Sequence, residues 1–94
     1  MKLANKKEME QNIEKLKDWK LKNKKIHKLF VFSDFVSAIR FVRTLADLAE
    51  KEKHHPDISI TYNKVHLTLW THDTHGISKK DFSLASKIDR LMKK

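Results

Sequence analysis

Several residue types are scarce in this chain of 94 residues, which has no cysteine, one glycine and one proline. Without cysteine the chain has no disulfide framework, no thiolate nucleophile and no cysteine-based zinc site. The shortage of glycine and proline argues against flexible linkers and low-complexity segments. We therefore expect residues 1–94 to form a single domain.

Long apolar runs are also missing. The first residues, MKLANKKEMEQNIEKL, lack the apolar stretch of a signal peptide. No segment approaches the roughly 20 consecutive apolar residues that a membrane-spanning helix needs. These features predict a soluble protein of the cytoplasm with no membrane partner.

Arginine is scarce although the formal net charge is +9, because most of the 21 basic residues are lysines. Proteins that read a nucleic-acid sequence favour arginine, whose flat guanidinium pairs with guanine. We therefore expect no specific nucleic-acid partner. Weak binding to any polyanion is still a possible function of so basic a chain. Its signature is an affinity that falls steeply with salt.

Three helices are indicated by capping signals and apolar spacing. Residues 5–18 begin with Asn5 and Glu8, which form a capping box. A second helix is predicted from an N-cap at Ser33 to about residue 53, and a third begins at Ser78, where Ser78 and Asp81 form another capping signature. The predicted apolar face of the second helix consists of Phe35, Ile39, Val42, Leu45, Ala46 and Ala49.

Four strands complete the pattern. WKLKNKK and residues 26–32 are the first pair, with a turn near Asn23 and Lys24. Residues 57–63 and 64–72 alternate apolar and polar side chains, which is typical of a hairpin. The order α-β-β-α-β-β-α, with runs of antiparallel strands, indicates an α+β fold.

The second hairpin predicts a cluster of histidines. A turn at Asn63 and Lys64 places Ile58, Ile60 and Tyr62 opposite Leu69, Leu67 and Val65, which together form the buried face. The same register puts His55 opposite His72 on the other face, where facing residues have Cβ atoms about 5 Å apart. His54 adjoins this pair.

The histidines His54, His55 and His72 have two functional interpretations. Histidine titrates near neutral pH, which suits acid–base catalysis, and zinc accepts three neutral imidazoles. The metal interpretation is weaker because the helical spacing of metal-binding histidines is missing and adjacent strand residues point to opposite faces. His27, His66 and His75 have no predicted partner and are interpreted as surface residues.

A resemblance to a known family rests on the segment HHPDISITYNKVHLTLWTHDTHGISKKDFSLASKID and the AEKEK before it. His-His-Pro-Asp, Tyr-Asn-Lys-Val, Thr-His-Asp and the following Gly, Ser, Asp and Leu-Ala stand in the order and at the spacing of the pterin-4a-carbinolamine dehydratases, also called 4a-hydroxytetrahydrobiopterin dehydratases. The resemblance implies four antiparallel strands with three helices on one face. It also implies homodimers or homotetramers.

The activity that this resemblance implies is metal-free and needs no cofactor. Such hydro-lyases dehydrate 4a-hydroxytetrahydropterin, which an aromatic amino acid hydroxylase leaves behind, to quinonoid dihydropterin. His54 and His72 match the positions expected to transfer protons, and His55 matches one expected to hold the pterin. Glu50, at another family position, is expected to orient an imidazole.

Other matching positions have structural explanations as well. Asp81 matches a family site residue, but we expect capping of the third helix to be its main role. Pro56 and Asp57 are expected to support the site through the backbone at the start of a strand. Trp70 departs from the small polar residue that the family more often has, and either narrows the pocket or offers the pterin a stacking surface.

A protein-interaction role on the same fold is the alternative function. Family members in animals also bind a homeodomain transcription factor, and bacterial relatives assist Rubisco assembly. The intact set of three histidines favours the enzyme.

Overall fold

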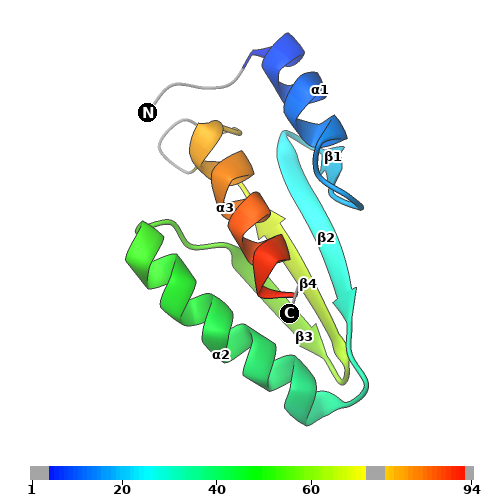
Figure 1. Ribbon diagram of the computed structural model, residues 1–94. Helices are drawn as coiled ribbons and strands as arrows, with labels where there is room; N and C mark the ends of the chain where they lie inside the picture. Colours follow the sequence, from blue (N-terminus) through cyan, green and yellow to red (C-terminus); the bar gives the residue numbers. More distant parts are fainter. Residues whose placement is uncertain (1–4, 72–75, 93–94) are drawn as a thin grey trace.

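The computed structural model describes residues 5–71 and 76–92, whose elements follow the order α-β-β-α-β-β-α. The strands pair antiparallel in the order β1-β2-β4-β3, and the helices cover one face of this sheet (Figure 1). This architecture confirms the predicted fold. The elements are α1 (Lys6–Glu14), β1 (Lys20–Lys22), β2 (Lys25–Val31), α2 (Phe35–Glu52), β3 (Asp57–Thr61), β4 (Lys64–Leu69) and α3 (Lys79–Leu91).

The caps of α1 and α3 form as predicted. The backbone N–H of Glu8 donates to Oδ1 of Asn5 at 2.8 Å, and the N–H of Asn5 donates to the Glu8 carboxylate at 3.0 Å. At α3, the N–H of the N-cap residue Ser78 donates to Oδ2 of Asp81 at 2.9 Å. Helix α1 ends at Glu14, earlier than predicted, with Lys15 as its C-cap.

Helix α2 differs from its prediction in cap and in face. Its N-cap is Asp34 rather than Ser33, because the Asp34 carboxylate accepts the N–H of Ser37 at 2.8 Å. Phe35 is about half exposed, at 49%, although it was assigned to the core face. The helix is rotated relative to the predicted stripe, and the residues that it buries are Ala38, Phe41, Leu45 and Ala49.

The register of the β3–β4 hairpin is not the predicted one. Ile60 pairs with Val65 rather than Leu67, so every partner is displaced by two residues, although Ile58 and Ile60 stay on the same face as Val65 and Leu67. The turn therefore moves to Tyr62 and Asn63, and Tyr62 takes the positive φ of 52°. Asn63 exchanges hydrogen bonds of 2.8 Å with the backbone of Phe32, a tertiary contact that holds the turn in this position. The assignment of Ile58, Ile60 and Tyr62 to the buried face is wrong, because their side chains are 39%, 36% and 65% exposed.

The core lies between the helices and the sheet, and no helix of residues 5–71 and 76–92 lies on the opposite side of the sheet (Figure 1). We call that opposite side the open face; it contains Lys25, His27, Asp57, His66 and Thr68. Within the described ranges, none of the helices combines the length and the apolar character that crossing a membrane requires. The core consists of Trp19, Ile26, Phe30, Ala38, Phe41, Leu45, Val65, Leu67, Leu69, Ile77, Phe82, Leu84, Ala85 and Ile88.

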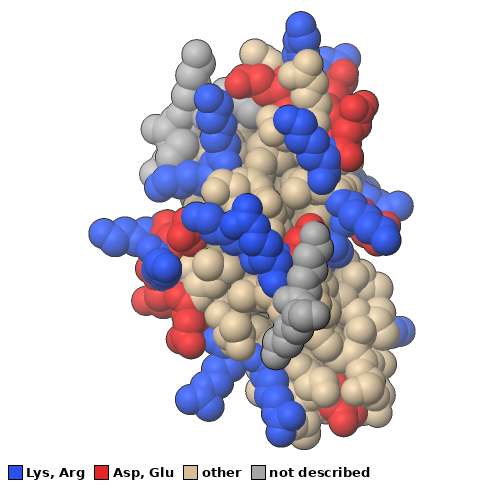
Figure 2. All heavy atoms as spheres, viewed as in Figure 1, with Lys and Arg blue, Asp and Glu red and all other residues tan. Residues whose placement is uncertain are grey.

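The surface charge is dispersed. Figure 2 shows Lys and Arg side chains over most of the visible face, with Asp and Glu among them. Some of the lysines are paired, as Lys28 is with Asp89 at 2.8 Å and Lys87 with Glu52 at 2.6 Å. A mixed surface of this kind is typical of solvated charges rather than of a single basic patch.

Candidate active site

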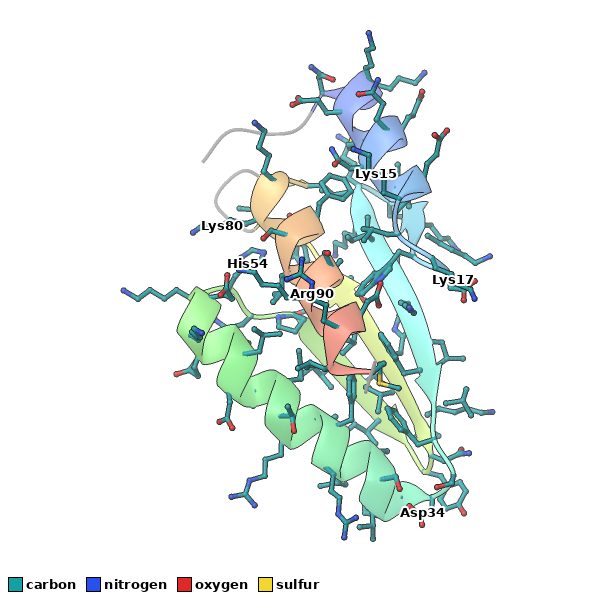
Figure 3. All side chains as sticks on the ribbon, viewed as in Figure 1. Lys15, Lys17, Asp34, His54, Lys80 and Arg90 are labelled. Atoms are coloured by element: carbon teal, nitrogen blue, oxygen red, sulfur yellow. The ribbon has the colours of Figure 1, made fainter. Side chains whose placement is uncertain are left out.

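The backbone that leaves α2 brings His54 against α3. Lys53, the C-cap of α2, adopts the left-handed conformation with φ 54° and ψ 38°. The N–H of His54 then donates to the carbonyl of Ala49 at 3.1 Å, which closes the last turn of the helix. Pro56 follows, where the chain can no longer continue a helix. Figure 3 shows His54 where the chain leaves α2, beside the start of α3.

His54 is paired with Asp81 of α3. The imidazole Nε2 lies 2.6 Å from Oδ1 of Asp81, and the side chains of His54 and Asp81 are 11% and 0% exposed. An ionised carboxylate can only accept hydrogen bonds, so Nε2 carries the proton. When the ring is neutral, Nδ1 is therefore its unprotonated nitrogen. It has no hydrogen-bond partner among residues 5–71 and 76–92.

Asp81 performs more than the predicted capping. Oδ2 receives the cap N–H of Ser78 at 2.9 Å and the hydroxyl of Thr71 at 2.8 Å, while Oδ1 receives the imidazole of His54. A fully buried carboxylate needs such donors because removing a charge from water is costly. Capping and orientation of an imidazole therefore use different oxygens of one side chain.

His55 has a carboxylate partner of its own on the surface. Its Nε2 lies 2.5 Å from Glu50, and the two side chains are 62% and 76% exposed. Glu50 was expected to orient an imidazole, and it contacts His55, the immediate neighbour of His54. The consecutive histidines thus use carboxylates of different helices, Glu50 of α2 and Asp81 of α3.

Asp57 and Trp70 meet on the open face. The indole N–H of Trp70 donates to Asp57 at 3.0 Å. The ammonium group of Lys25 lies 4.3 Å from the centre of the Trp70 ring, which is a cation–π contact. Sequence reasoning missed Lys25, because only the β2–β4 register, in which Ile26 pairs with Leu69, brings these strands together.

Two histidines interpreted as isolated have partners. The rings of His27 and His66 stack with centroids 5.4 Å apart. The hydroxyl of Thr68 lies 3.2 Å from Nδ1 of His27. These contacts also follow from the pairing of β2 with β4, which no local pattern in the sequence specifies.

The predicted pairing of His55 with His72 rested on the wrong register. In the observed register Asp57 pairs with Thr68 rather than Trp70. Extending this register by two residues from Asp57 therefore no longer places His55 opposite His72. His72 and His75 lie outside the described residues. Among residues 5–71 and 76–92, no group of three or more His, Cys, Asp and Glu side chains is arranged to hold a metal ion.

A hollow in the described part of the chain lies away from these residues. A groove of about 380 Å³ lies between α1 and α3 and has none of the candidate residues in its lining. Its lining residues are Asn12, Lys15, Leu16, Lys79, Phe82, Ser83 and Ser86.

The chain has an α+β fold in which a buried carboxylate, Asp81, orients the imidazole of His54. This arrangement is typical of proteins that carry out acid–base chemistry on a small molecule. Comparison with known families is more specific. The family model for pterin 4 alpha carbinolamine dehydratase matches residues 2–91. The chain belongs to this family.

Relatives match over most of the chain. A Sulfurisphaera tokodaii protein, provisionally named pterin-4-alpha-carbinolamine dehydratase, is 44% identical over 92 residues, which cover 98% of this chain and 99% of the relative. A Chloroflexus aurantiacus protein with the same provisional name is 51% identical over 75 residues, which cover 80% of this chain and 81% of the relative.

Solved structures with this fold carry names of more than one kind. A crystal structure described as a transcriptional coactivator/pterin dehydratase from Brucella melitensis matches with a TM-score of 0.92 and 32% identity, over 96% of this chain and 98% of that one. A pterin dehydratase-like protein, described as a RuBisCO assembly factor in the alpha-carboxysome, matches with a TM-score of 0.65 and 26% identity, over 80% and 87% of the chains.

Proposed function

We propose that this protein dehydrates 4a-hydroxytetrahydropterin to quinonoid dihydropterin by general acid–base catalysis. Membership of the pterin 4 alpha carbinolamine dehydratase family supports a pterin substrate and a dehydratase. The observation that carries the mechanism is the buried pair of His54 and Asp81, with 2.6 Å between Nε2 and Oδ1. This pair presents an imidazole of defined tautomer, as a base that must accept one particular proton requires.

The reaction needs two proton transfers. The C4a–O bond breaks, and the hydroxyl leaves as water only after it gains a proton. The electron pair of the N5–H bond forms the N5–C4a double bond, and the N5 proton passes to a base. A positioned acid and a positioned base each contribute roughly 10²- to 10⁴-fold to such a reaction.

We assign the base to His54, because the hydrogen bond to Asp81 uses Nε2 and leaves the lone pair of Nδ1 for the N5 proton. The acid is assigned to His72, on the family resemblance alone. His55 and its partner Glu50 hold the pterin, as their exposed position at the exit of α2 allows.

Pro56, Asp57 and Trp70 support the site rather than transfer protons. Pro56 limits the backbone between His55 and β3. Asp57 accepts the indole N–H of Trp70, and with Lys25 it holds the indole in one orientation on the open face. The ring of Trp70 offers a flat surface for a flat substrate.

The physiological setting that we propose is the recycling of tetrahydrobiopterin in the cytoplasm, beside an aromatic amino acid hydroxylase. We further propose that the chain forms a homodimer or homotetramer. Exposed apolar side chains on the first turns of α2 suit self-association: Phe35, Val36 and Ile39 are 49%, 55% and 40% exposed. Light scattering on the purified protein measures the assembly size, and a monomer at all concentrations would contradict this part.

The activity is tested with synthetic 4a-hydroxytetrahydropterin and a chelator present throughout. We expect the wild type to accelerate loss of the substrate above the buffer rate, and His54→Ala and His72→Ala to remove most of that acceleration. His66→Ala is the matched control, because the ring of His66 stacks on His27 and has no part in the proposed proton transfers. Wild-type protein that is no faster than buffer would overturn the proposal.

A second candidate is an interaction partner of another protein. Its support is the same exposed apolar stretch of α2 together with the names of the two structural relatives, a transcriptional coactivator and a RuBisCO assembly factor. Pull-down of one stoichiometric partner by a protein without dehydratase activity would favour this role. Loss of that partner in Val36→Asp would assign the contact to α2.

A further inference from the structure

We infer that Thr71 is a positioning residue for His54: its hydroxyl, itself oriented by Ser78, holds the Asp81 carboxylate in the geometry that selects the Nε2–H tautomer. This inference rests on the proposed function for its catalytic consequence, but its structural part concerns the tautomer alone. Thr71 acts through Asp81, which accepts the Thr71 hydroxyl on Oδ2 and the His54 imidazole on Oδ1.

Burial makes this cluster sensitive to the loss of one donor. Ser78 and Asp81 are 0% exposed and Thr71 is 6% exposed. Among the described residues, every buried side-chain nitrogen and oxygen has a hydrogen-bond partner. Water cannot easily replace a donor that is removed here, so a vacant position on Asp81 costs more than it would at the surface.

The valence of the groups determines the direction of the hydrogen bonds. The Thr71 hydroxyl lies 2.8 Å from Oδ2 of Asp81, and since the carboxylate can only accept, Thr71 donates its one proton there. Oγ1 of Thr71 is 2.7 Å from Oγ of Ser78, so in that contact Ser78 is the donor. The donors thus run from Ser78 to Thr71 and from Thr71 to Asp81, while His54 donates to the other oxygen of Asp81.

The backbone holds the members of this chain in place. Thr71 and Gly76 form an isolated antiparallel bridge, in which the N–H of Thr71 donates to the Gly76 carbonyl at 2.6 Å. Ser78 is the N-cap of α3, and its N–H binds the same Asp81 oxygen as Thr71 at 2.9 Å. The hydroxyl of Thr71 is therefore held in a fixed position beside Asp81, where the ends of β4 and α2 meet the start of α3.

Valine is the informative substitution because it keeps the shape of threonine and removes the hydroxyl. Thr71→Val leaves Oδ2 of Asp81 with the Ser78 N–H and leaves the Ser78 hydroxyl without its acceptor. With one constraint gone, the carboxylate can turn, and we expect both neutral tautomers of His54 to be populated. We expect kcat to fall about 10- to 100-fold, by analogy with the loss of partners that orient metal-binding histidines, with KM nearly unchanged.

The experiment compares three variants of the full chain. Thr71→Val removes the hydroxyl, Thr71→Ser restores it, and Thr44→Val is the matched control, since the exposed Thr44 hydroxyl donates only to the Arg40 carbonyl on α2. Nitrogen-15 NMR of the histidine rings, at a pH where His54 is neutral, reports the tautomer independently of activity. The kinetic assay gives kcat and KM.

We expect the wild type, Thr71→Ser and Thr44→Val to show the Nε2–H tautomer of His54, and Thr71→Val to show a mixture. An unchanged tautomer and kcat in folded Thr71→Val would overturn the inference. If Thr71→Val does not fold, Thr71→Ala removes the same hydroxyl with a smaller side chain, and an unchanged tautomer and kcat in folded Thr71→Ala would overturn the inference in the same way. A wild type with the expected tautomer but no dehydratase activity would instead refute the proposed function and leave the positioning role intact.

Discussion

The two consecutive histidines form similar hydrogen bonds in opposite surroundings. His54 meets Asp81 at 2.6 Å and His55 meets Glu50 at 2.5 Å. The first carboxylate is 0% exposed and the second 76% exposed. Solvent competes for the second pair and screens it, so the pair contributes little orientation. Distance alone therefore does not identify an oriented catalytic histidine, whereas burial and additional donors do.

The largest expected effect is on catalysis in Asp81→Asn compared with Glu50→Gln. A carboxylate offers two acceptor oxygens, but an amide offers one, so an asparagine at position 81 cannot accept from both His54 and the Thr71–Ser78 side. We expect kcat to fall about 10²- to 10⁴-fold in Asp81→Asn and less than about 10-fold in Glu50→Gln. The dehydration assay measures both. Equal losses would remove the distinction between the pairs.

A smaller effect is expected on stability. Asp81→Ala leaves the Thr71 hydroxyl, the Ser78 N–H and the His54 imidazole without their buried acceptor. We expect the free energy of unfolding to fall by about 3 kcal/mol, against less than about 1 kcal/mol for Glu50→Ala. Urea denaturation followed by circular dichroism gives both values. A similar loss in the two variants would mean that the Glu50 pair is less solvated than its exposure indicates.

The smallest effect concerns Asp34, an exposed carboxylate whose partner is backbone. The N–H of Ser37, and then its hydroxyl, lower the pKa of Asp34 from its ordinary value of 3.8. Because the pKa is lower in the folded state, the unfolded chain binds more protons just below pH 3.8, and the stabilisation by Asp34 is lost as pH falls through the folded pKa. The stability difference between wild type and Asp34→Asn should therefore shift against the wild type in acid.

Urea denaturation at a series of acidic pH values measures this difference. A difference that is constant down to the pH of acid unfolding would contradict the role of the Ser37 hydrogen bonds. In that case Asp34 would contribute as little to stability as the solvated Glu50 is expected to. Burial alone would then separate the carboxylates that matter from those that do not.

The fold was predictable where short-range interactions control it. Asn5 with Glu8 and Ser78 with Asp81 are capping partners three residues apart, and both caps form. The predicted position of the β3–β4 turn was wrong, because a contact with a distant segment outweighs the local turn preference. The turn moved to Tyr62 and Asn63 because Asn63 binds the backbone of Phe32, which is 31 residues away.

The candidate residues were predictable as residue types, but their partners were not. His54 and His55 stand out in the sequence as adjacent histidines before the only proline. Their division into one buried and one exposed ring depends on the αL residue Lys53 and on α3 lying beside the exit of α2. The Thr71 hydroxyl was overlooked for the same reason, since its role comes from a contact with a side chain on α3.

Local patterns in the sequence were enough to predict the helices and strands, their order and the histidines as candidate site residues. Capping, alternation and turn preference act over only a few residues. The partners of Asp81, the strand register and the exposure of each histidine came only from the packed molecule. They depend on contacts between segments far apart along the chain, and burial, which gives one carboxylate its influence and leaves the other solvated, exists only after those segments meet.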